Sequence, residues 1–409
     1  MRWFNFINLY FSLKKIILIS SFTPSLINFR LNLMNDLQKQ GYKIYGFGPE
    51  EDKLTLGLLK NNGIKFVKYP LNRNTLNPLG DLKTIKFIRK KVKAINPDFI
   101  IPYTIKPVLY GNLAIKGLTV KSISLITGLG FYALPSVNTK EKIAKAIITS
   151  LYKLGTTKKV TYAFQNTDDI AFFKEKKILK PNIKWCITPG SGIDITKFDY
   201  SDPVLKPISF LFIGRLLKSK GIELLLNSAE ILKQKYPSIK FNIIGMPDPL
   251  NADSVNEDKL KEFHNQNIIN YIGEVDNVIP YFNESSVFVL PSYYREGVPR
   301  TLLEALAKGK PIITTDHVGC RETVVNNENG FLIKPKSEKQ LTKALEKFIN
   351  NPDLITKFSP KSRDLAEQKF DVKIVNKILI NQIKSLWLFY FFSYPWFGII
   401  RLKKNMLTM

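Results

Sequence analysis

The sequence predicts an α/β protein of two doubly wound domains, in which helices cover both faces of a parallel sheet. Three observations support this fold class. The chain has 409 residues, which is more than one ordinary hydrophobic core accommodates. Short β-branched runs, typical of buried parallel strands, alternate with segments of helical apolar spacing. The alternation stops at a glycine- and proline-rich loop over residues 189–194 and then starts again, so we expect a domain boundary there.

Strands and helices are expected to alternate in the first domain, residues 1–190. The run KIILIS forms its first strand, and the helix that follows ends at Gly41. The expected strands cover residues 15–20, 43–47, 64–69, 98–101, 122–126 and 159–163. The expected helices cover residues 31–39, 82–95 and 140–154.

The same alternation is expected in the second domain, residues 191–365. Its strands cover residues 208–213, 240–244, 268–271, 287–290 and 311–314. Helices are expected over residues 221–236, 299–308, 337–350 and 360–385. We expect residues 366–385 to pack back on the first domain as a closing helix. Two such domains place the carboxyl ends of their strands on opposite sides of a cleft, where open α/β sheets bind ligands.

The charge of the chain is concentrated in its first half. The formal net charge is +27, and residues 1–200 hold 32 Lys and Arg against 12 Asp and Glu. Such a field attracts nucleic acid, an anionic bilayer or a phosphorylated substrate. No helix-turn-helix, zinc-finger or RNA-binding signature is present, so we expect no nucleic-acid partner. A Lys-rich composition without a specific partner is the alternative explanation.

The cysteines and the two ends of the chain indicate a cytoplasmic protein. Cys186 and Cys320 have no metal or redox spacing, and the N-terminus lacks a small-residue cleavage site. The aromatic segment 386–400 is 15 residues long, contains Pro395 and is flanked by cations. A bilayer span needs roughly 20 residues. We therefore expect the tail, residues 386–409, to lie at a membrane interface, with a buried terminal helix or a disordered tail as alternatives.

Two glutamates around a predicted helix start are the main candidates for substrate binding. Glu296 lies in the loop after the strand at 287–290, and Glu304 lies more than one turn into the helix that Pro299 begins. The free N–H groups between them suit a diphosphate, and Gly297 allows a ligand to approach the backbone. The two carboxylates can accept hydrogen bonds from sugar and ribose hydroxyls. Solvated charges on a helix are the alternative explanation of this spacing.

Residues 291–313, which contain both glutamates, closely resemble the E-x7-E region of family 4 retaining glycosyltransferases. That family has the GT-B fold, two Rossmann-like domains facing each other across a cleft, and the resemblance extends from residue 15 to about residue 385. Residues 25–30 look like the family's first loop, and residues 191–194 look like its entry to the second domain. One branch of the family adds N-acetylated hexosamines or related sugars to undecaprenyl-diphosphate-linked glycans. The segments most similar to that branch are residues 103–107, 126–130 and 319–323.

The resemblance implies roles for individual residues. Glu296, Arg215 and Lys220 would have catalytic roles. Arg215 and Lys220 follow an expected strand, and two cations in such a loop can clamp a leaving diphosphate. The donor-binding residues would be Gly214, Ile272, Gly297, Val298, Arg300, Thr301, Leu302 and Glu304. The cleft loops on the acceptor side would contribute Ser25, Asn28, Arg30, Lys106, Thr127, Gly128 and Gly130.

Other cofactor chemistries find little support in the sequence. His264 and His317 have no partner at metal or Ser-His-Asp spacing, and no Asp-x-Asp pair follows a strand. The first strand-helix turn lacks G-x-G-x-x-G, which argues against a dehydrogenase. We therefore expect no metal and no cofactor.

These observations lead to one expected function. A sugar, an N-acetylhexosamine or a related hexose, would pass with retention from a nucleotide-sugar, most simply a UDP-sugar, to a lipid-diphosphate-linked or glycan acceptor. The enzyme would sit on the anionic cytoplasmic face of the inner membrane and build a surface polysaccharide or a glycoprotein glycan. The alternatives are a nucleotide-sugar 2-epimerase of the same fold and a catalytically silent nucleotide-sugar-binding scaffold at the membrane.

Overall fold

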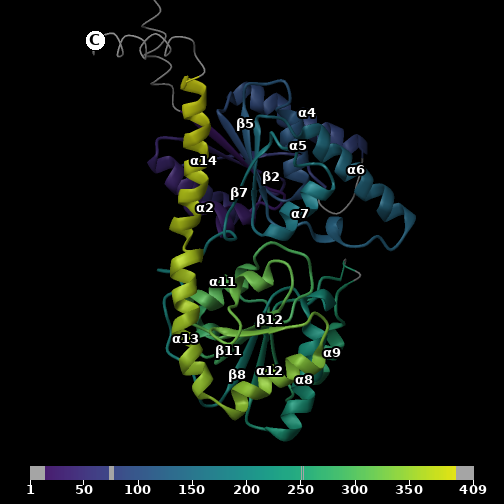
Figure 1. The fold of residues 1–409 in the computed structure, drawn as a ribbon, viewed down its shortest axis with the longest axis vertical. Coiled ribbons are helices and arrows are strands. Elements are labelled where there is room, and N and C mark those ends of the chain that lie inside the picture. The colour runs from purple at the N-terminus through teal and green to yellow at the C-terminus, as the bar shows by residue number, and fades with distance from the viewer. Residues whose placement is uncertain (1–13, 73–77, 250, 252, 393–409) are drawn as a thin grey trace, which may run out of the picture.

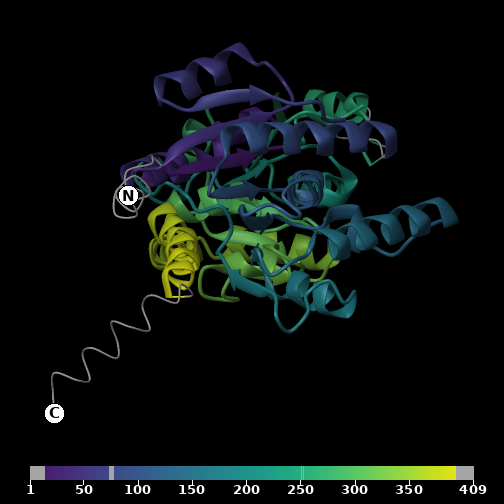
Figure 2. The same ribbon diagram turned by 90° about the horizontal axis from the view of Figure 1, so that it is seen from above.

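A computed structural model describes residues 14–72, 78–249, 251 and 253–392, with side chains up to residue 386. These residues form two parallel sheets, each with helices on both faces (Figure 1). Figure 2 shows the same arrangement from above, with α6 projecting from one side. The predicted α/β class and the two Rossmann-like domains are confirmed.

The first sheet has seven strands in the order β3-β2-β1-β4-β5-β6-β7. Its strands are β1 (Lys15–Ile19), β2 (Lys43–Gly48), β3 (Lys65–Lys68), β4 (Phe99–Pro102), β5 (Lys121–Ile126), β6 (Val160–Phe164) and β7 (Lys184–Ile187). The helices around it are α2 (Pro24–Lys39), α3 (Lys53–Asn61), α4 (Pro78–Ile95), α5 (Ile105–Ala114), α6 (Thr139–Gly155) and α7 (Thr167–Glu175), with the 3-10 turn η1 (Gly130–Ala133).

Strand β1 shows why this sheet is buried on both faces. Successive side chains of a strand point to opposite faces, and all four of its isoleucine and leucine side chains are fully buried. Ile17 and Ile19 belong to the apolar cluster that α4, α5, α6 and α7 cover. Ile16 and Leu18 belong to the cluster on the other face, under α2 and α3. The continuous apolar run is therefore a consequence of helices on both sides.

The second sheet has six strands in the order β10-β9-β8-β11-β12-β13 and its own apolar cluster. Its strands are β8 (Ser209–Ile213), β9 (Lys240–Ile244), β10 (Asn270–Gly273), β11 (Val287–Leu290), β12 (Ile312–Thr315) and β13 (Gly330–Ile333). The helices in this half of the chain are α8 (Ile222–Lys235), α9 (Glu257–Asn265), α10 (Ile279–Asn283), α11 (Arg300–Ala307), α12 (Glu338–Asn350), α13 (Asp353–Leu365) and α14 (Val372–Phe392). Short turns are η2 (Lys218–Lys220), η3 (Cys320–Thr323) and the π-turn η4 (Ala366–Phe370).

Helix α14 lies against the first domain, although it follows the second in sequence. Leu379, Ile383 and Leu386 join the apolar cluster that α2 and β1 form. The side chain of Asn376 donates a hydrogen bond to Asp36 on α2 at 2.8 Å. Figure 1 shows α13 and α14 running along one side of both domains.

The chain passes between the domains twice, and the two crossing segments are hydrogen-bonded to each other. The Ile193 N–H donates to the Phe370 carbonyl at 2.8 Å, and the Val372 N–H donates to the Ile193 carbonyl at 2.9 Å. The two connections therefore run side by side next to the cleft.

The structure departs from the sequence-based expectations at several elements. Residues 25–30, expected as a loop, form the first turns of α2, because Pro24 suits a helix start and Leu26 continues the apolar stripe of Leu33 and Leu37. Helix α14 continues beyond residue 385, so it includes the start of the segment expected as a tail. Residues 393–409 of that expected tail lie outside the described residues. The helices and strands not expected from the sequence are α3, α5, α7, α9, α10, β7 and β13. The helix expected over residues 360–385 is divided into the end of α13, the π-turn η4 and α14.

Candidate functional site

The loop between β11 and α11 places the two glutamates on the cleft. α11 begins after Pro299, so Glu296 lies in the loop and Glu304 lies in the second turn of the helix. Leu302 and Leu303 hold α11 in the core of the second domain, where both are fully buried. The first turn of the helix therefore faces the cleft with its free N–H groups.

Glu296 forms an ion pair with Lys220, a residue from the loop after β8. The exposed fractions of the two side chains are only 20% and 11%. Gly221 makes this approach possible. It has a φ of 80°, and a side chain there would collide with the carbonyl group of Pro291. Lys220 and Glu296 are 76 residues apart in sequence, and the tight packing of their two loops brings them together.

Glu304 pairs within its own helix. Its carboxylate lies 3.2 Å from Nε of Arg300, whose Nη1 donates to the Gly192 carbonyl at 2.8 Å. Burial raises the pKa of Glu304, and the positive charge of Arg300 partly offsets that rise. Arg300 thereby links α11 to the first connection between the domains.

Three adjoining cavities line the cleft. One, of about 370 Å³, is bounded by Glu296, Lys220, Gly214 and Thr301. A second, of about 530 Å³, contains Glu304 and shares Arg300 and Thr301 with the first. The third, of about 470 Å³, shares Glu296 and Thr127 with the first. The two glutamates therefore stand in neighbouring compartments of one elongated cleft.

Arg215 lies near this pair but is more open to solvent. It lines the third cavity together with Glu296, and its Nη1 lies 3.7 Å from the carboxylate of Asp248. Its side chain is 55% exposed. Lys106, also in the third cavity, lies 3.6 Å from Asp81. This compartment is thus bordered by cations from both domains.

Backbone contacts between the domains hold the Glu296 loop in place. The Gly297 N–H donates to the Thr127 carbonyl at 3.1 Å, and the Gly130 N–H donates to the Arg295 carbonyl at 2.8 Å. Gly128 has a φ of 109°, and a side chain there would collide with the backbone of Gly297. The glycines on both sides are therefore needed for the two loops to meet.

Residues that the sequence did not single out complete these contacts. Gln165, which is buried after β6, accepts a hydrogen bond from the Val298 N–H at 3.1 Å. Arg295 lies 3.4 Å from the fully buried carboxylate of Asp169, at the start of α7. Burial raises the pKa of Asp169 to about 6, while Arg295 opposes the rise. Arg321 pairs with Asp168 at 3.1 Å. No sequence spacing connects these residues, because each pair joins two domains.

Most residues predicted for the site line the three cavities. Those in the first cavity are Ser25, Arg30, Thr127, Gly214, Lys220, Glu296, Gly297, Val298, Arg300 and Thr301. The second cavity adds Asn28 and Glu304, and the third adds Lys106, Gly128, Gly130 and Arg215. Ile272 and Leu302 line none of the three, because both pack in or against the core of the second domain.

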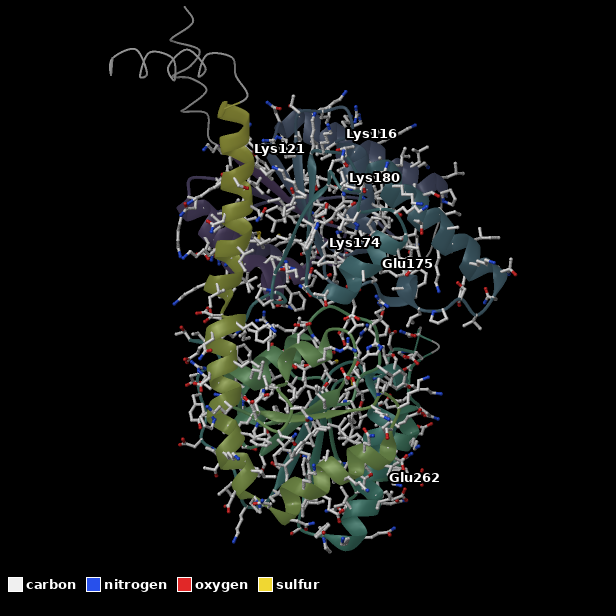
Figure 3. All side chains as sticks on the ribbon, in the orientation of Figure 1. Lys116, Lys121, Lys174, Glu175, Lys180 and Glu262 are labelled. Carbon is white, nitrogen blue, oxygen red and sulfur yellow. The ribbon has the colours of Figure 1, made fainter. Side chains whose placement is uncertain are left out.

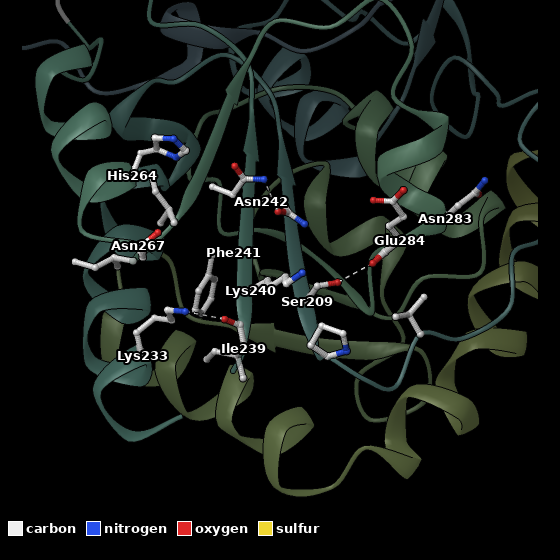
Figure 4. Close-up of a pocket in the computed structure, with 15 residues that line it drawn as sticks. Ser209, Lys233, Ile239, Lys240, Phe241, Asn242, His264, Asn267, Asn283 and Glu284 are labelled. Carbon is white, nitrogen blue, oxygen red and sulfur yellow. Dashed lines mark hydrogen bonds between the residues drawn. The ribbon is translucent and has the colours of Figure 1, made fainter. Parts of the chain in front are cut away.

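A larger cavity, of about 730 Å³, lies outside the cleft (Figure 4). Ser209 and Lys240, the first residues of β8 and β9, line it together with Asn242 and His264. It therefore opens at the amino ends of the strands, whereas open α/β sheets bind ligands at the carboxyl ends. For this reason the cleft remains the candidate site.

Within the described residues, no group of three or more His, Cys, Asp and Glu side chains could hold a metal ion. In the described part of the chain, every helix is too short or too polar to cross a bilayer.

Both domains match families of known glycosyltransferases. Residues 196–365 match the family described as glycosyl transferases group 1, and residues 15–166 match the family described as glycosyl transferase 4-like. A similar relative is the N,N'-diacetylbacillosaminyl-diphospho-undecaprenol alpha-1,3-N-acetylgalactosaminyltransferase of Campylobacter jejuni. It is 28% identical over 81% of this chain and 88% of its own length.

Solved structures show the same fold. Sucrose-phosphate synthase from Thermosynechococcus elongatus superposes with a TM-score of 0.74 and 16% identity, over 92% of this chain and 99% of its own. The Anabaena protein Alr3699/HepE in complex with UDP-glucose superposes with a TM-score of 0.71 and 17% identity, over 91% of this chain and 99% of its own. With a matching family in each domain and the GT-B fold throughout, the chain belongs to the group 1, family 4-like glycosyltransferases.

Proposed function

We propose that this glycosyltransferase moves a sugar, with retention of configuration, from a UDP-sugar to a lipid-diphosphate-linked acceptor. The observation that carries the proposal is the Lys220–Glu296 pair, because Glu296 lines both the first and the third cavity. A sugar held there would lie between a donor compartment on one side and an acceptor compartment on the other.

The donor would occupy the first and second cavities. Its diphosphate would lie at the start of α11, where unpaired N–H groups and the helix dipole favour anions. Glu304 would accept hydrogen bonds from the ribose hydroxyls, and Glu296 from hydroxyls of the sugar. The Anabaena structure, which contains UDP-glucose and has the same fold, supports a UDP-sugar as the donor.

The reaction itself needs little more than positioning and charge. The bond from the anomeric carbon to the diphosphate oxygen breaks as the acceptor oxygen bonds to the same face of that carbon. The acceptor's hydroxyl proton passes to the departing diphosphate oxygen. Lys220, Arg215 and the α11 start would stabilise the growing negative charge, which is the task that a metal ion performs in other transferases. We therefore propose that the reaction needs no metal.

The acceptor would enter through the third cavity from the first domain. Phe131 and Ile148 line this cavity, and the surface beside it on η1 and α6 exposes Phe131, Ile143 and Ile147. Apolar side chains among lysines suit the interface of an anionic bilayer. The name of the Campylobacter relative includes an undecaprenol-diphosphate acceptor, which supports this substrate class. We place the enzyme peripherally on the cytoplasmic membrane face.

The test is a transfer assay with the full chain. Purified protein is incubated with UDP- and GDP-sugars, including N-acetylhexosamine donors, and with short-chain lipid-diphosphate acceptors. Mass spectrometry identifies the product and NMR its anomeric configuration. We expect transfer from a UDP-sugar with retention, and loss of product with Lys220→Ala. Binding of nucleotide-sugar without transfer, or epimerisation of the donor at C2, would contradict the proposal.

A further inference from the structure

Arg30 on α2 is buried at the edge of the first cavity. It is 4% exposed, and it lies where a surface helix would normally place an apolar residue. Its Nε is buried without a hydrogen-bond partner in the described residues. Burying a charge without a partner is strongly unfavourable, so this position needs an explanation.

No carboxylate of the chain offsets this charge. Among the described residues, Arg30 forms no ion pair, and the segments outside them contain no Asp or Glu in the sequence. The ring of Tyr103 lies 5.1 Å from the guanidinium. Burial lowers the pKa of Arg30 to about 10, Tyr103 opposes this, and the positive charge of Arg300 adds to it. Arg30 is therefore still charged at neutral pH.

Four other cations that line the cleft differ from Arg30 in this respect. Lys220 pairs with Glu296, Arg300 with Glu304, Lys106 with Asp81 and Arg215 with Asp248. Each of those charges is balanced within the protein. Among these five described cations, Arg30 alone has no anion as its partner, and it contacts an aromatic ring instead.

We propose that Arg30 binds an anionic diphosphate oxygen of a substrate in the cavity that it shares with Lys220 and Glu296. The inference deepens the proposed function, on which it rests, by adding a cation from the first domain. The cavity at Arg30 is lined from the opposite side by Gly214 and Thr301, next to the start of α11. A diphosphate there would be held from both domains at once. The stacking of Tyr103 orients the guanidinium but does not neutralise it.

A diphosphate can come from the nucleotide-sugar or from the lipid-linked acceptor, and titrations distinguish the two. Arg30→Gln and Arg30→Lys are compared with the wild type for binding of UDP, uridine and inorganic pyrophosphate. The KM for a short-chain lipid-diphosphate acceptor is measured separately. Arg89→Gln is the matched control, because Arg89 bonds the Ala114 and Lys116 carbonyls away from the cleft.

If the donor supplies the diphosphate, Arg30→Gln weakens UDP binding at least tenfold and leaves uridine binding unchanged. If the acceptor supplies the diphosphate, the affinity of Arg30→Gln for UDP is unchanged and its KM for the acceptor rises at least tenfold. Arg30→Lys keeps part of the affinity in either case. Unchanged UDP and pyrophosphate binding together with an unchanged acceptor KM would overturn the proposal.

A stability measurement makes the test independent of turnover. Because Arg30 is an uncompensated buried charge, we expect Arg30→Met to raise the unfolding temperature of the ligand-free enzyme and to abolish its further rise with pyrophosphate. If pyrophosphate stabilises the wild type through Arg30 but no sugar is transferred, the proposed function fails and the site stands. If Arg30→Gln, Arg30→Lys and Arg30→Met all lower the unfolding temperature, Arg30 is structural and the site is rejected.

Discussion

Lys220 and Glu296 neutralise each other in the ligand-free cleft, and a diphosphate would change that balance. Each side chain keeps a small exposed fraction toward the cavity. A bound anion can share the ammonium group with Glu296, because an ammonium has three donors. The cation needed for departure of the diphosphate is thus held in place before the substrate arrives.

We expect Lys220→Ala to lower kcat by about 10²–10³, the usual range for loss of one donor to a developing charge. Activity should persist in EDTA, since protein cations face the diphosphate. Turnover rates with and without chelator check this expectation. Lys218→Ala is the control, because Lys218 is an exposed neighbour in the same turn. Loss of activity in EDTA that Mg²⁺ or Mn²⁺ restores would contradict the metal-free mechanism.

Glu304 is expected to act in binding. Glu304→Ala should weaken UDP or GDP affinity by about 1.5–3 kcal/mol, because ribose hydroxyls lose a charged acceptor. Glu304→Gln keeps an acceptor oxygen and should lose less. Isothermal titration measures both affinities. A dissociation constant unchanged by Glu304→Ala for both nucleotides would remove Glu304 from the donor site.

At the scale of elements, the start of α7 meets the loop that carries Glu296. Asp168 and Asp169 occupy the first turn of α7, where carboxylates are favoured by the helix dipole. Their partners, Arg321 and Arg295, come from the second domain. This contact orients the Glu296 loop from the opposite side of the cleft.

The Asp169–Arg295 contact should make activity pH-dependent. Burial raises the pKa of Asp169 to about 6, while Arg295 and Asn166 lower it and Asp168 raises it. This pKa lies above the pKa of about 3.9 that an Asp has in the unfolded chain. Ionisation of Asp169 therefore lowers the free energy of unfolding as pH rises from about 4 to 6. Below pH 6, protonation leaves Arg295 without its counter-charge. We expect kcat/KM to fall there with an apparent pKa near 6.

The Asp169→Asn variant isolates this effect in a pH–rate profile. It should be less active than the wild type at neutral pH and lack the fall near pH 6. The wild type loses stability as pH rises from about 4 to 6 and the variant does not. The free energy of unfolding of the variant should therefore increase relative to that of the wild type over this range. An acid limb that is identical in both proteins would show that another group titrates.

The fold was predictable where local patterns carry the information. β1 and β11 were found because buried parallel strands are continuous apolar runs, and α11 because Pro299, which directly precedes it, marks a helix start. The start of helix α2 was predicted too late, because residues 25–30 were assigned to a loop by their resemblance to the family, although Leu26 continues the apolar stripe of the helix. Gln165 and Asp169 could not be predicted, since their roles depend on how two domains meet. Glu296 and Lys220 were found through motifs on separate loops.

At the scale of the whole molecule, the two domains differ in charge. Residues 1–200 hold 32 Lys and Arg against 12 Asp and Glu, and residues 201–409 hold 29 against 22. Figure 3 labels Glu175 and four lysines on the first domain, and Glu262 on the second. The apolar surface of α6 belongs to the same basic domain, with Ile143 56% and Ile147 47% exposed. Salt screens attraction between charges but not burial of apolar area, so the two contributions can be separated.

We expect the full chain to co-sediment with anionic vesicles, and salt to weaken this binding without abolishing it. Ile143→Glu with Ile147→Glu should reduce the salt-resistant part. To test the tail, the chain is truncated after Phe392. This end point keeps Leu386, which is buried and whose carbonyl accepts a hydrogen bond from Lys121. The truncated enzyme should fold, act on a short-chain acceptor and bind vesicles less in high salt. Unchanged binding by the truncated and by the doubly substituted protein would contradict the membrane proposal.

The paired crossing at Ile193 and Phe370 has a mechanical consequence. Two connections that run side by side restrict relative rotation of the domains far more than one flexible linker would. The bridge between Ile193 and Asp371 joins the two connections, so we expect the domains to rotate mainly about that line. Opening of the cleft would then break the hydrogen bond from the Gly297 N–H to the Thr127 carbonyl, which joins the two domains. Proteolytic nicking of either connection alone would leave both domains joined.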